Sequence, residues 1–225
     1  MNEIYGLEQN YDNVAIEDLE SERQTLVNIL IDASSSMNQY EMVMGSCLNN
    51  FKQAIANSKE RDEMLIAKTV FASNVDHHGY QLIDDFDTDY SAGGTTALYD
   101  AIVEAQQRLL NEKQNGYMQT LDNNGIRTKA VIAIFSDGYD NNSKSSLSEA
   151  RKALNYLQSK EIIVAFIAFG DGAKGIANDL GINPENIREF DASESELRKI
   201  FMILSKSAIS ASKSAGVSNG AFFTV

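Results

Sequence analysis

The stretch Leu-Val-Asn-Ile-Leu-Ile-Asp-Ala-Ser-Ser-Ser, residues 26–36, joins a nearly continuous apolar run to a polar cluster. The apolar part, Leu26 to Ile31, is short and rich in β-branched residues, which is typical of a strand that is buried on both faces. Strands of this kind belong to parallel sheets that helices cover on each side. We therefore expect this run to be a buried sheet strand that ends at a polar loop.

The rest of the chain alternates between similar apolar runs and amphipathic stretches. Further strands are expected at 64–71, 130–135, 162–169 and 187–190, with an antiparallel neighbour at 80–83 after a turn near Asn74. Helices are expected at 40–56, 98–109, 147–158, 176–180 and 194–210, and a loop is expected around 122–125. Strands that alternate with helices predict an α/β fold with a mostly parallel sheet covered on both faces.

The chain is expected to form one domain with two short flanks. Residues 1–23 are polar and acidic and predict an N-terminal arm, residues 24–210 predict the domain, and residues 211–225 predict a C-terminal tail. After Ser205 the chain is rich in serine and alanine, and we expect the last helix to fray there.

Composition excludes several classes of function. Lys and Arg total 19 against 32 Asp and Glu, so the net charge is −13 and argues against nucleic-acid binding, which needs a basic surface. No segment has the roughly 20 apolar residues that span a bilayer, and the first ten residues lack a signal-peptide core. The single cysteine, Cys47, excludes an internal disulfide, fits a reducing compartment and is expected to be a buried thiol. We therefore expect a cytoplasmic protein that binds neither nucleic acid nor membrane.

Polar side chains follow two of the expected strands and open one helix. Asp32, Ser34 and Ser36 follow the first strand, Asp137 follows the strand that ends at 135, and Thr96 lies in Gly-Gly-Thr-Thr before a helix. Ligands of open α/β sheets bind outside the carboxyl ends of the strands, so we expect these five side chains to meet. Their ligand atoms are all oxygens, which favours a hard cation, Mg²⁺, Mn²⁺ or Ca²⁺, over Zn²⁺.

These residues resemble the metal-ion-dependent adhesion site of von Willebrand factor A domains. The run Asp32-Ala-Ser-Ser-Ser36 matches the Asp-x-Ser-x-Ser element of that family. Thr96, five residues before Ala101, matches its metal-site threonine, and Asp137, in Phe-Ser-Asp-Gly, matches its second aspartate. The resemblance extends from about residue 25 to residue 210 and includes the order of the elements.

The resemblance implies a Rossmann-like, doubly wound sheet of six strands, mostly parallel with one antiparallel edge strand and with helices on both faces. It also implies one divalent ion, contacted by the hydroxyls of Ser34, Ser36 and Thr96 and by Asp32 and Asp137 directly or through water. The sequence looks similar to bacterial intracellular members of the family, including those found with tellurium-resistance-type stress systems.

The implied function is a protein-binding adaptor without catalysis. A carboxylate from an Asp or Glu of a protein partner replaces one water on the cation, which gives an acidic protein a local anchor for an acidic group. The surrounding loops, 139–145 and 84–89, are expected to set specificity.

Two other classes of function fit the sequence less well. A Mg²⁺-dependent phosphatase or phosphotransferase would use Asp32 as its nucleophile, but haloacid-dehalogenase-like enzymes carry a second Asp where this chain has Ser34, and no Gly-x-Ser-x-Gly elbow is present. A structural subunit of a larger assembly would have an inert metal site and would dock through the N-terminal arm and Phe222-Phe223.

Three further motifs favour ordinary structural roles. The run Asp85-Phe-Asp-Thr-Asp89 lacks the glycine and glutamate of a calcium loop at 90 and 96, so a solvated acidic loop is expected. His77 and His78 are expected on a surface turn rather than in a zinc site. Gly93-Gly94 belongs to no nucleotide-binding motif, so nucleotide binding is not expected.

Overall fold

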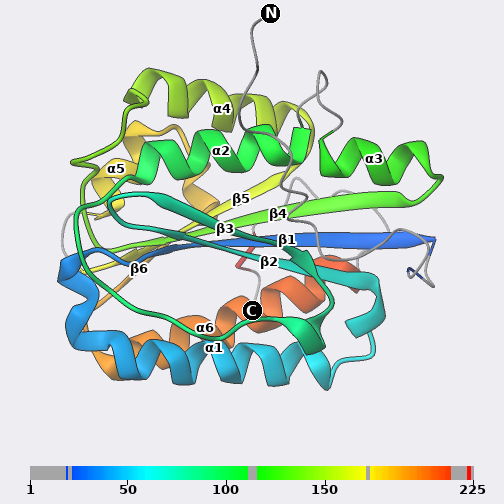
Figure 1. Ribbon diagram of the computed structural model, residues 1–225, viewed down its shortest axis with the longest axis horizontal. Helices are drawn as coiled ribbons and strands as arrows, with labels where there is room; N and C mark the ends of the chain where they lie inside the picture. The colour runs from blue at the N-terminus through cyan, green and yellow to red at the C-terminus, as the bar shows by residue number, and fades with distance from the viewer. Residues whose placement is uncertain (1–18, 20–21, 111–115, 171–172, 214–221, 224–225) are drawn as a thin grey trace, which may run out of the picture.

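The computed structural model describes residue 19 and residues 22–110, 116–170, 173–213 and 222–223. Within these residues one sheet has the strand order β3-β2-β1-β4-β5-β6 (Figure 1). Only β2 and β3 are antiparallel, and every other neighbouring pair is parallel. The predicted mostly parallel six-stranded sheet with one antiparallel edge strand is confirmed. The strands are β1 (Arg23–Asp32), β2 (Met64–Phe71), β3 (Val75–Gln81), β4 (Arg127–Ser136), β5 (Ile163–Phe169) and β6 (Ile187–Phe190).

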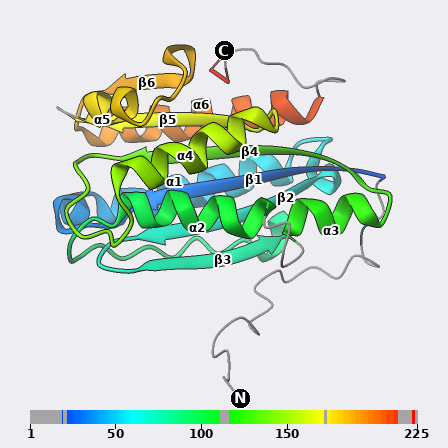
Figure 2. The ribbon, with the colours of Figure 1, turned by 90° about the horizontal axis from the view of Figure 1, so that it is seen from above.

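Helices cover both faces of the sheet. One layer contains α1 (Glu41–Ala56) and α6 (Glu194–Lys213), and the other contains α2 (Leu98–Leu110), α3 (Tyr117–Asn123), α4 (Leu147–Ser159) and α5 (Ala173–Asp179). Figure 1 shows the two layers on opposite sides of the strands, and Figure 2 shows the sheet between them from above. No helix of the described segments is long and apolar enough to cross a membrane.

The apolar run of β1 is buried on both faces, as its composition predicts. Leu26 and Leu30 pack in the core under α2 and α4, whereas Val27, Ile29 and Ile31 pack in the core under α1 and α6. This division follows from the alternation of side chains along a strand. Because β1 pairs with β2 on one side and β4 on the other, its carboxyl end lies in the middle of one edge of the sheet.

Two sequence predictions near the α2 layer are wrong in detail. The segment before Asn124 is not a simple loop, because α3 forms there and buries Tyr117 and Leu121. Tyr117 stacks on Tyr80 with ring centroids 4.8 Å apart, so this short helix is stabilised by a contact with β3 that no local pattern reveals. The strand predicted at 80–83 is the longer β3, which begins at Val75.

The last helix continues to Lys213 instead of fraying after Ser205. Three of its small polar side chains are buried, those of Ser205, Ser207 and Ser212, and the hydroxyls of Ser212 and Thr25 on β1 are 3.4 Å apart. Small residues let the helix approach β1 closely. This part of the helix is therefore packed through small serine side chains, and not through the large apolar side chains from which a buried helix is usually predicted.

The flanks lie largely outside the described residues, and the boundaries at 23 and 210 stay predictions. Within the predicted tail, Phe222 and Phe223 are buried in the core under α1 and α6. The backbone N–H of Phe222 donates to Asn186 Oδ1 at 2.7 Å, and Arg188 donates to the carbonyl of Phe223 at 3.2 Å. These two residues are therefore part of the folded domain.

Candidate metal centre

Two aspartates end neighbouring parallel strands. Asp32 is the last residue of β1, and Asp137 directly follows Ser136, the last residue of β4. Ile31 pairs with Phe135, so the two carboxylates leave the sheet side by side at its carboxyl edge. The structure thus brings together the two charged residues that the sequence predicted for the site.

Asp32 is fully buried, and hydrogen bonds engage both of its carboxylate oxygens. Oδ1 accepts from the backbone N–H of Ser34 at 2.9 Å, and Oδ2 accepts from the hydroxyl of Ser136 at 2.7 Å. Burial raises the pKa of Asp32 above its usual value, although these hydrogen bonds act in the opposite direction. The carboxylate therefore has one defined orientation.

The hydroxyls of Ser34 and Ser36 connect this carboxylate to Asp137. Ser36 Oγ donates to Asp137 Oδ1 at 3.0 Å, and Ser34 Oγ lies 2.9 Å from Ser36 Oγ. Burial, together with the nearby negative charge of Asp32, raises the pKa of Asp137 to about 6. Four of the five predicted ligands thus form one hydrogen-bonded group.

Thr96, the fifth predicted ligand, lies in a loop held against the loop that follows β1. The backbone N–H of Gly93 donates to Ala33 O at 2.7 Å, and the N–H of Ser35 donates to Gly94 O at 3.1 Å. Gly94 has φ +85°, and a Cβ there would lie 2.4 Å from Ser73 Oγ. The positive φ and this close approach favour glycine at position 94, two residues ahead of Thr96.

The loop after β4 fixes Thr96 from the other side. The backbone N–H of Thr96 donates to Asn141 Oδ1 at 2.8 Å. The carbonyl of Thr96 accepts from the backbone N–H groups of Asn141 and Asn142 at 3.0 and 3.1 Å. Thr96 is 5% exposed. Its backbone is therefore joined to the loop that carries Asp137.

The donor set fits a hard divalent cation. Three hydroxyls and two carboxylates supply only oxygen, and in the described part of the chain neither Asp32 nor Asp137 forms an ion pair with Lys or Arg. Nowhere in the described part of the chain do three or more His, Cys, Asp or Glu side chains form a group that could hold a metal. Within the described residues, the two carboxylates therefore lie near each other without a Lys or Arg partner.

Two supporting residues escaped sequence reasoning. Ser136 orients Asp32, and its position next to Asp137 at a strand end was the available signal. The hydroxyl of Tyr90 donates to the backbone carbonyl of Asp32 at 2.7 Å. Nothing local marked Tyr90, because it lies 58 residues from its partner.

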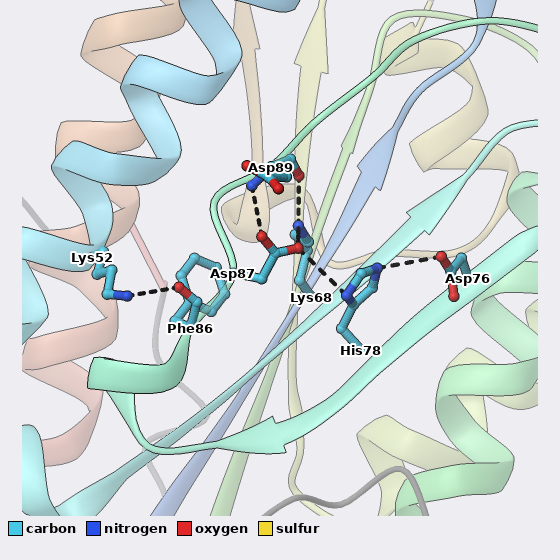
Figure 3. Close-up of polar contacts among 7 residues, drawn as sticks. All are labelled: Lys52, Lys68, Asp76, His78, Phe86, Asp87 and Asp89. Carbon is cyan, nitrogen blue, oxygen red and sulfur yellow. Dashed lines mark hydrogen bonds and ion pairs between the residues drawn. The ribbon is translucent and has the colours of Figure 1, made fainter. Parts of the chain in front are cut away.

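The acidic run and the histidines differ from their predictions. Asp85 and Asp89 are exposed, but Asp87 accepts a hydrogen bond from the buried Lys68, so this run is not simply solvated (Figure 3). His77 lies on β3 rather than on a surface turn, is 5% exposed, and has Nδ1 2.7 Å from the hydroxyl of Thr69. Cys47 is buried, as predicted, and burial raises the pKa of its thiol to about 11.

Solved structures with the same fold include adhesion and matrix proteins. Proximal thread matrix protein 1 from the mussel byssus, in a structure with a zinc-occupied MIDAS motif, is 19% identical with a TM-score of 0.59, and the match covers 83% of this chain and 46% of that one. The pilus adhesin SpaC from Lactobacillus rhamnosus GG is 12% identical with a TM-score of 0.63, over 83% of this chain and 30% of that one. The chain thus spans less than half the length of both.

A third structure, the manganese-loaded TRAP protein of Plasmodium vivax, is 18% identical with a TM-score of 0.52. The match covers 80% of this chain and 74% of that one. The TM-scores of these three structures establish a shared fold, and at such low identities they establish the fold alone. No curated protein sequence matches the chain. The profile of the von Willebrand factor type A domain matches residues 27–202, which include all five predicted metal ligands. Because that match spans more than half of its length, the chain belongs to the von Willebrand factor type A domain family.

Proposed function

We propose that this domain binds one divalent cation, Mg²⁺ in the cell, through Asp32, Ser34, Ser36, Thr96 and Asp137 and uses it to bind a carboxylate of a protein partner. The observation that carries the proposal is the hydrogen-bonded group in which Ser34 and Ser36 connect two carboxylates that lack an ion-pair partner among the described residues. Zinc and manganese in two structures of the same fold support a divalent ion.

Each residue has a defined task in this proposal. Asp32 and Asp137 supply the negative charge, and Ser136 and the Ser34 backbone orient the Asp32 carboxylate. The three hydroxyls are neutral ligands. The charge of the divalent cation is therefore balanced by the two carboxylates, and no net negative charge is left at the site to repel a carboxylate of the partner. When bound, the cation supplies an electrophilic position at which an outside carboxylate replaces water.

The site is proposed to bind and not to catalyse. Asp32 is fully buried, and its oxygens already accept hydrogen bonds from Ser34 and Ser136, so it is poorly placed as a nucleophile. The rival role as an assembly subunit loses support, because Phe222 and Phe223 are buried in their own domain and are not free to dock elsewhere. A cytoplasmic location, supported by the unpaired buried Cys47, and the similarity to tellurium-resistance-type members remain predictions.

Calorimetric titration of Mn²⁺ and Mg²⁺ into chelator-treated protein tests metal binding. We expect one saturable site in the wild type and none in Asp32→Ala. Asp85→Ala is the matched control, because it removes an exposed carboxylate away from the site and should bind as the wild type does. Equal binding by wild type and Asp32→Ala would refute the assignment of the site.

The carboxylate step is tested with acetate as the probe. Mn²⁺ on the protein speeds the relaxation of water protons through exchange of its bound water. We expect acetate to reduce this enhancement saturably, with acetamide as the neutral control. An enhancement that acetate and acetamide leave equally unchanged would show that no bound water is replaced by carboxylate.

A further inference from the structure

The segment that carries Thr96 to the metal site is long and irregular. After a short 3-10 turn at Ile83–Asp85, residues 86–97 form neither helix nor strand before α2 begins. In Figure 1 this segment runs along α1 and then rises to the start of α2. We call residues 86–96 the strap. Its path depends on contacts with the rest of the domain, because it has no internal ladder of hydrogen bonds.

Lys68, on β2, holds the middle of the strap. Its side chain is 1% exposed, and Nζ donates to Asp87 Oδ2 at 2.5 Å and to the carbonyl of Asp89 at 2.6 Å (Figure 3). The N–H of Asp89 donates to Asp87 Oδ1 at 2.9 Å, which closes a tight turn around the ammonium group. Burial acts to raise the pKa of Asp87, but the hydrogen bonds from Lys68 and the Asp89 N–H, together with the nearby charges of Lys68 and His78, lower it below its usual value. A charged pair therefore fixes this turn.

Lysine is an unusual choice at this place. Strand β2 is otherwise apolar except for Thr69, and Met64 and Ile66, which precede Lys68 at two-residue spacing, pack in the core under α1 and α6. A buried ammonium group is costly unless it is paired and hydrogen-bonded. An apolar residue would suit this core better, so the contact with the strap is the feature that lysine provides.

The strap reaches the metal site directly after the turn held by Lys68. Tyr90, next to Asp89, donates its hydroxyl to the Asp32 carbonyl at 2.7 Å. Ala92 N–H donates to Glu41 Oε1 at 3.3 Å, and Gly93 N–H donates to Ala33 O at 2.7 Å. A short, continuous path of contacts therefore links Lys68 to Asp32 and, along the strap, to Thr96.

We propose that Lys68 is a positioning residue of the metal site: by binding Asp87 and the carbonyl of Asp89 it sets the course of the strap, and with it the placement of Tyr90 on Asp32 and of Thr96. The proposal rests on the proposed metal binding. It requires no contact between Lys68 and the cation.

The test is Mn²⁺ affinity, measured by calorimetry in Lys68→Met at a temperature where circular dichroism shows the variant fully folded. We expect the affinity to fall about 10-fold, the effect typical of residues that orient metal ligands. The control is Lys160→Met, which makes the same change of charge at an exposed position after α4. Loss of a positive charge alone would strengthen cation binding. The positioning role thus predicts a lower Mn²⁺ affinity in Lys68→Met, whereas a pure charge effect predicts a higher one.

A second pair of variants separates geometry from charge and remains usable if Lys68→Met folds poorly. Asp87→Asn keeps one acceptor oxygen for Lys68 but gives up the second acceptor and the charge, so it should weaken Mn²⁺ binding less than Asp87→Ala does. Asp87→Ala removes the attachment and should weaken binding about as much as Lys68→Met. Lys68→Met and Asp87→Ala break the same path of contacts. The variant that carries both changes should therefore bind Mn²⁺ only slightly more weakly than either single variant.

The outcomes distinguish this inference from the function on which it rests. If the wild type binds Mn²⁺ and Lys68→Met or Asp87→Ala binds it as tightly as Lys160→Met, the positioning role is refuted and the metal site stands. If the wild type binds no Mn²⁺, the proposed function fails and this inference fails with it.

Discussion

The candidate metal-site edge and the cluster around Lys68 both hold aspartates that are at least half-buried, but among the described residues only the second has a lysine paired with them. Asp87 is paired with the Lys68 ammonium group at 2.5 Å, and Lys68 also binds the carbonyl of Asp89. Asp32 and Asp137 have serine hydroxyls and backbone N–H groups as partners instead. Among the described residues, the carboxylate of Asp87 is paired with an ammonium group, whereas those of Asp32 and Asp137 are not, and we propose that an outside cation takes that place. If the proposed site binds metal, the feature that distinguishes it from the cluster around Lys68 is the absence of a Lys or Arg partner among the described residues and not the number of acidic side chains.

The largest expected effect comes from removing the internal cation. Lys68→Met leaves Asp87 without its buried partner and should lower the free energy of unfolding by about 3 kcal/mol, the lower end for a broken buried pair because Asp87 is partly exposed. Lys52→Met is the control. Lys52 donates to the carbonyls of Asp84 and Phe86 at a more exposed place, so its loss should cost about 1 kcal/mol. Urea unfolding of both variants checks the difference, and equal losses would contradict the special role of the buried pair.

A buried histidine gives the next effect. His77, on β3, is held neutral because burial lowers its pKa to about 3. The unfolded chain, with a pKa near 6.5, binds a proton first, so stability should fall as pH falls below about 6.5. Between pH 7.5 and 5.5 the wild type should lose about 1.4 kcal/mol relative to His77→Gln.

The matched control for that pH dependence is His78→Gln, which changes the more exposed neighbour and keeps His77. It should retain the wild-type difference between pH 7.5 and 5.5 in urea unfolding. A pH profile that is the same in His77→Gln and the wild type would show that the buried imidazole does not contribute.

The smallest effect has the opposite sign to the first. Asp32→Asn removes a buried charge that no cation of the described chain neutralises, so the metal-free protein should become more stable by about 1 kcal/mol. The same variant should lose the stabilisation that Mn²⁺ gives the wild type, about 2.7 kcal/mol at 100 times the dissociation constant. Urea unfolding with and without Mn²⁺ measures both. A metal-free Asp32→Asn less stable than the wild type would break the contrast between the two clusters.

Much of the fold was predictable because its signals are local. The nearly continuous apolar run of β1 predicted a strand buried on both faces, and the amphipathic stretch at 194–210 predicted α6, whose first turn is capped by Ser193: its hydroxyl accepts from the N–H of Glu196 at 3.3 Å. The buried serines of α6 misled the prediction, since serine is common in fraying ends and equally suits close packing against β1. Helix α3 was missed because its stabilising contact, Tyr117 on Tyr80, joins two distant segments.

By itself the sequence determined the residue types at the candidate site and the strand ends that bring them to one edge, because Asp-x-Ser-x-Ser and the aspartate after β4 each follow an apolar run directly. Only the tertiary structure decided which acidic residues are already paired. Lys68 meets Asp87 from 19 residues away, Ser136 meets Asp32 from 104, and Tyr90 meets Asp32 from 58. Such contacts depend on the path of irregular loops over a packed core, and that path follows from side-chain packing across the whole domain, which no periodicity in the sequence encodes.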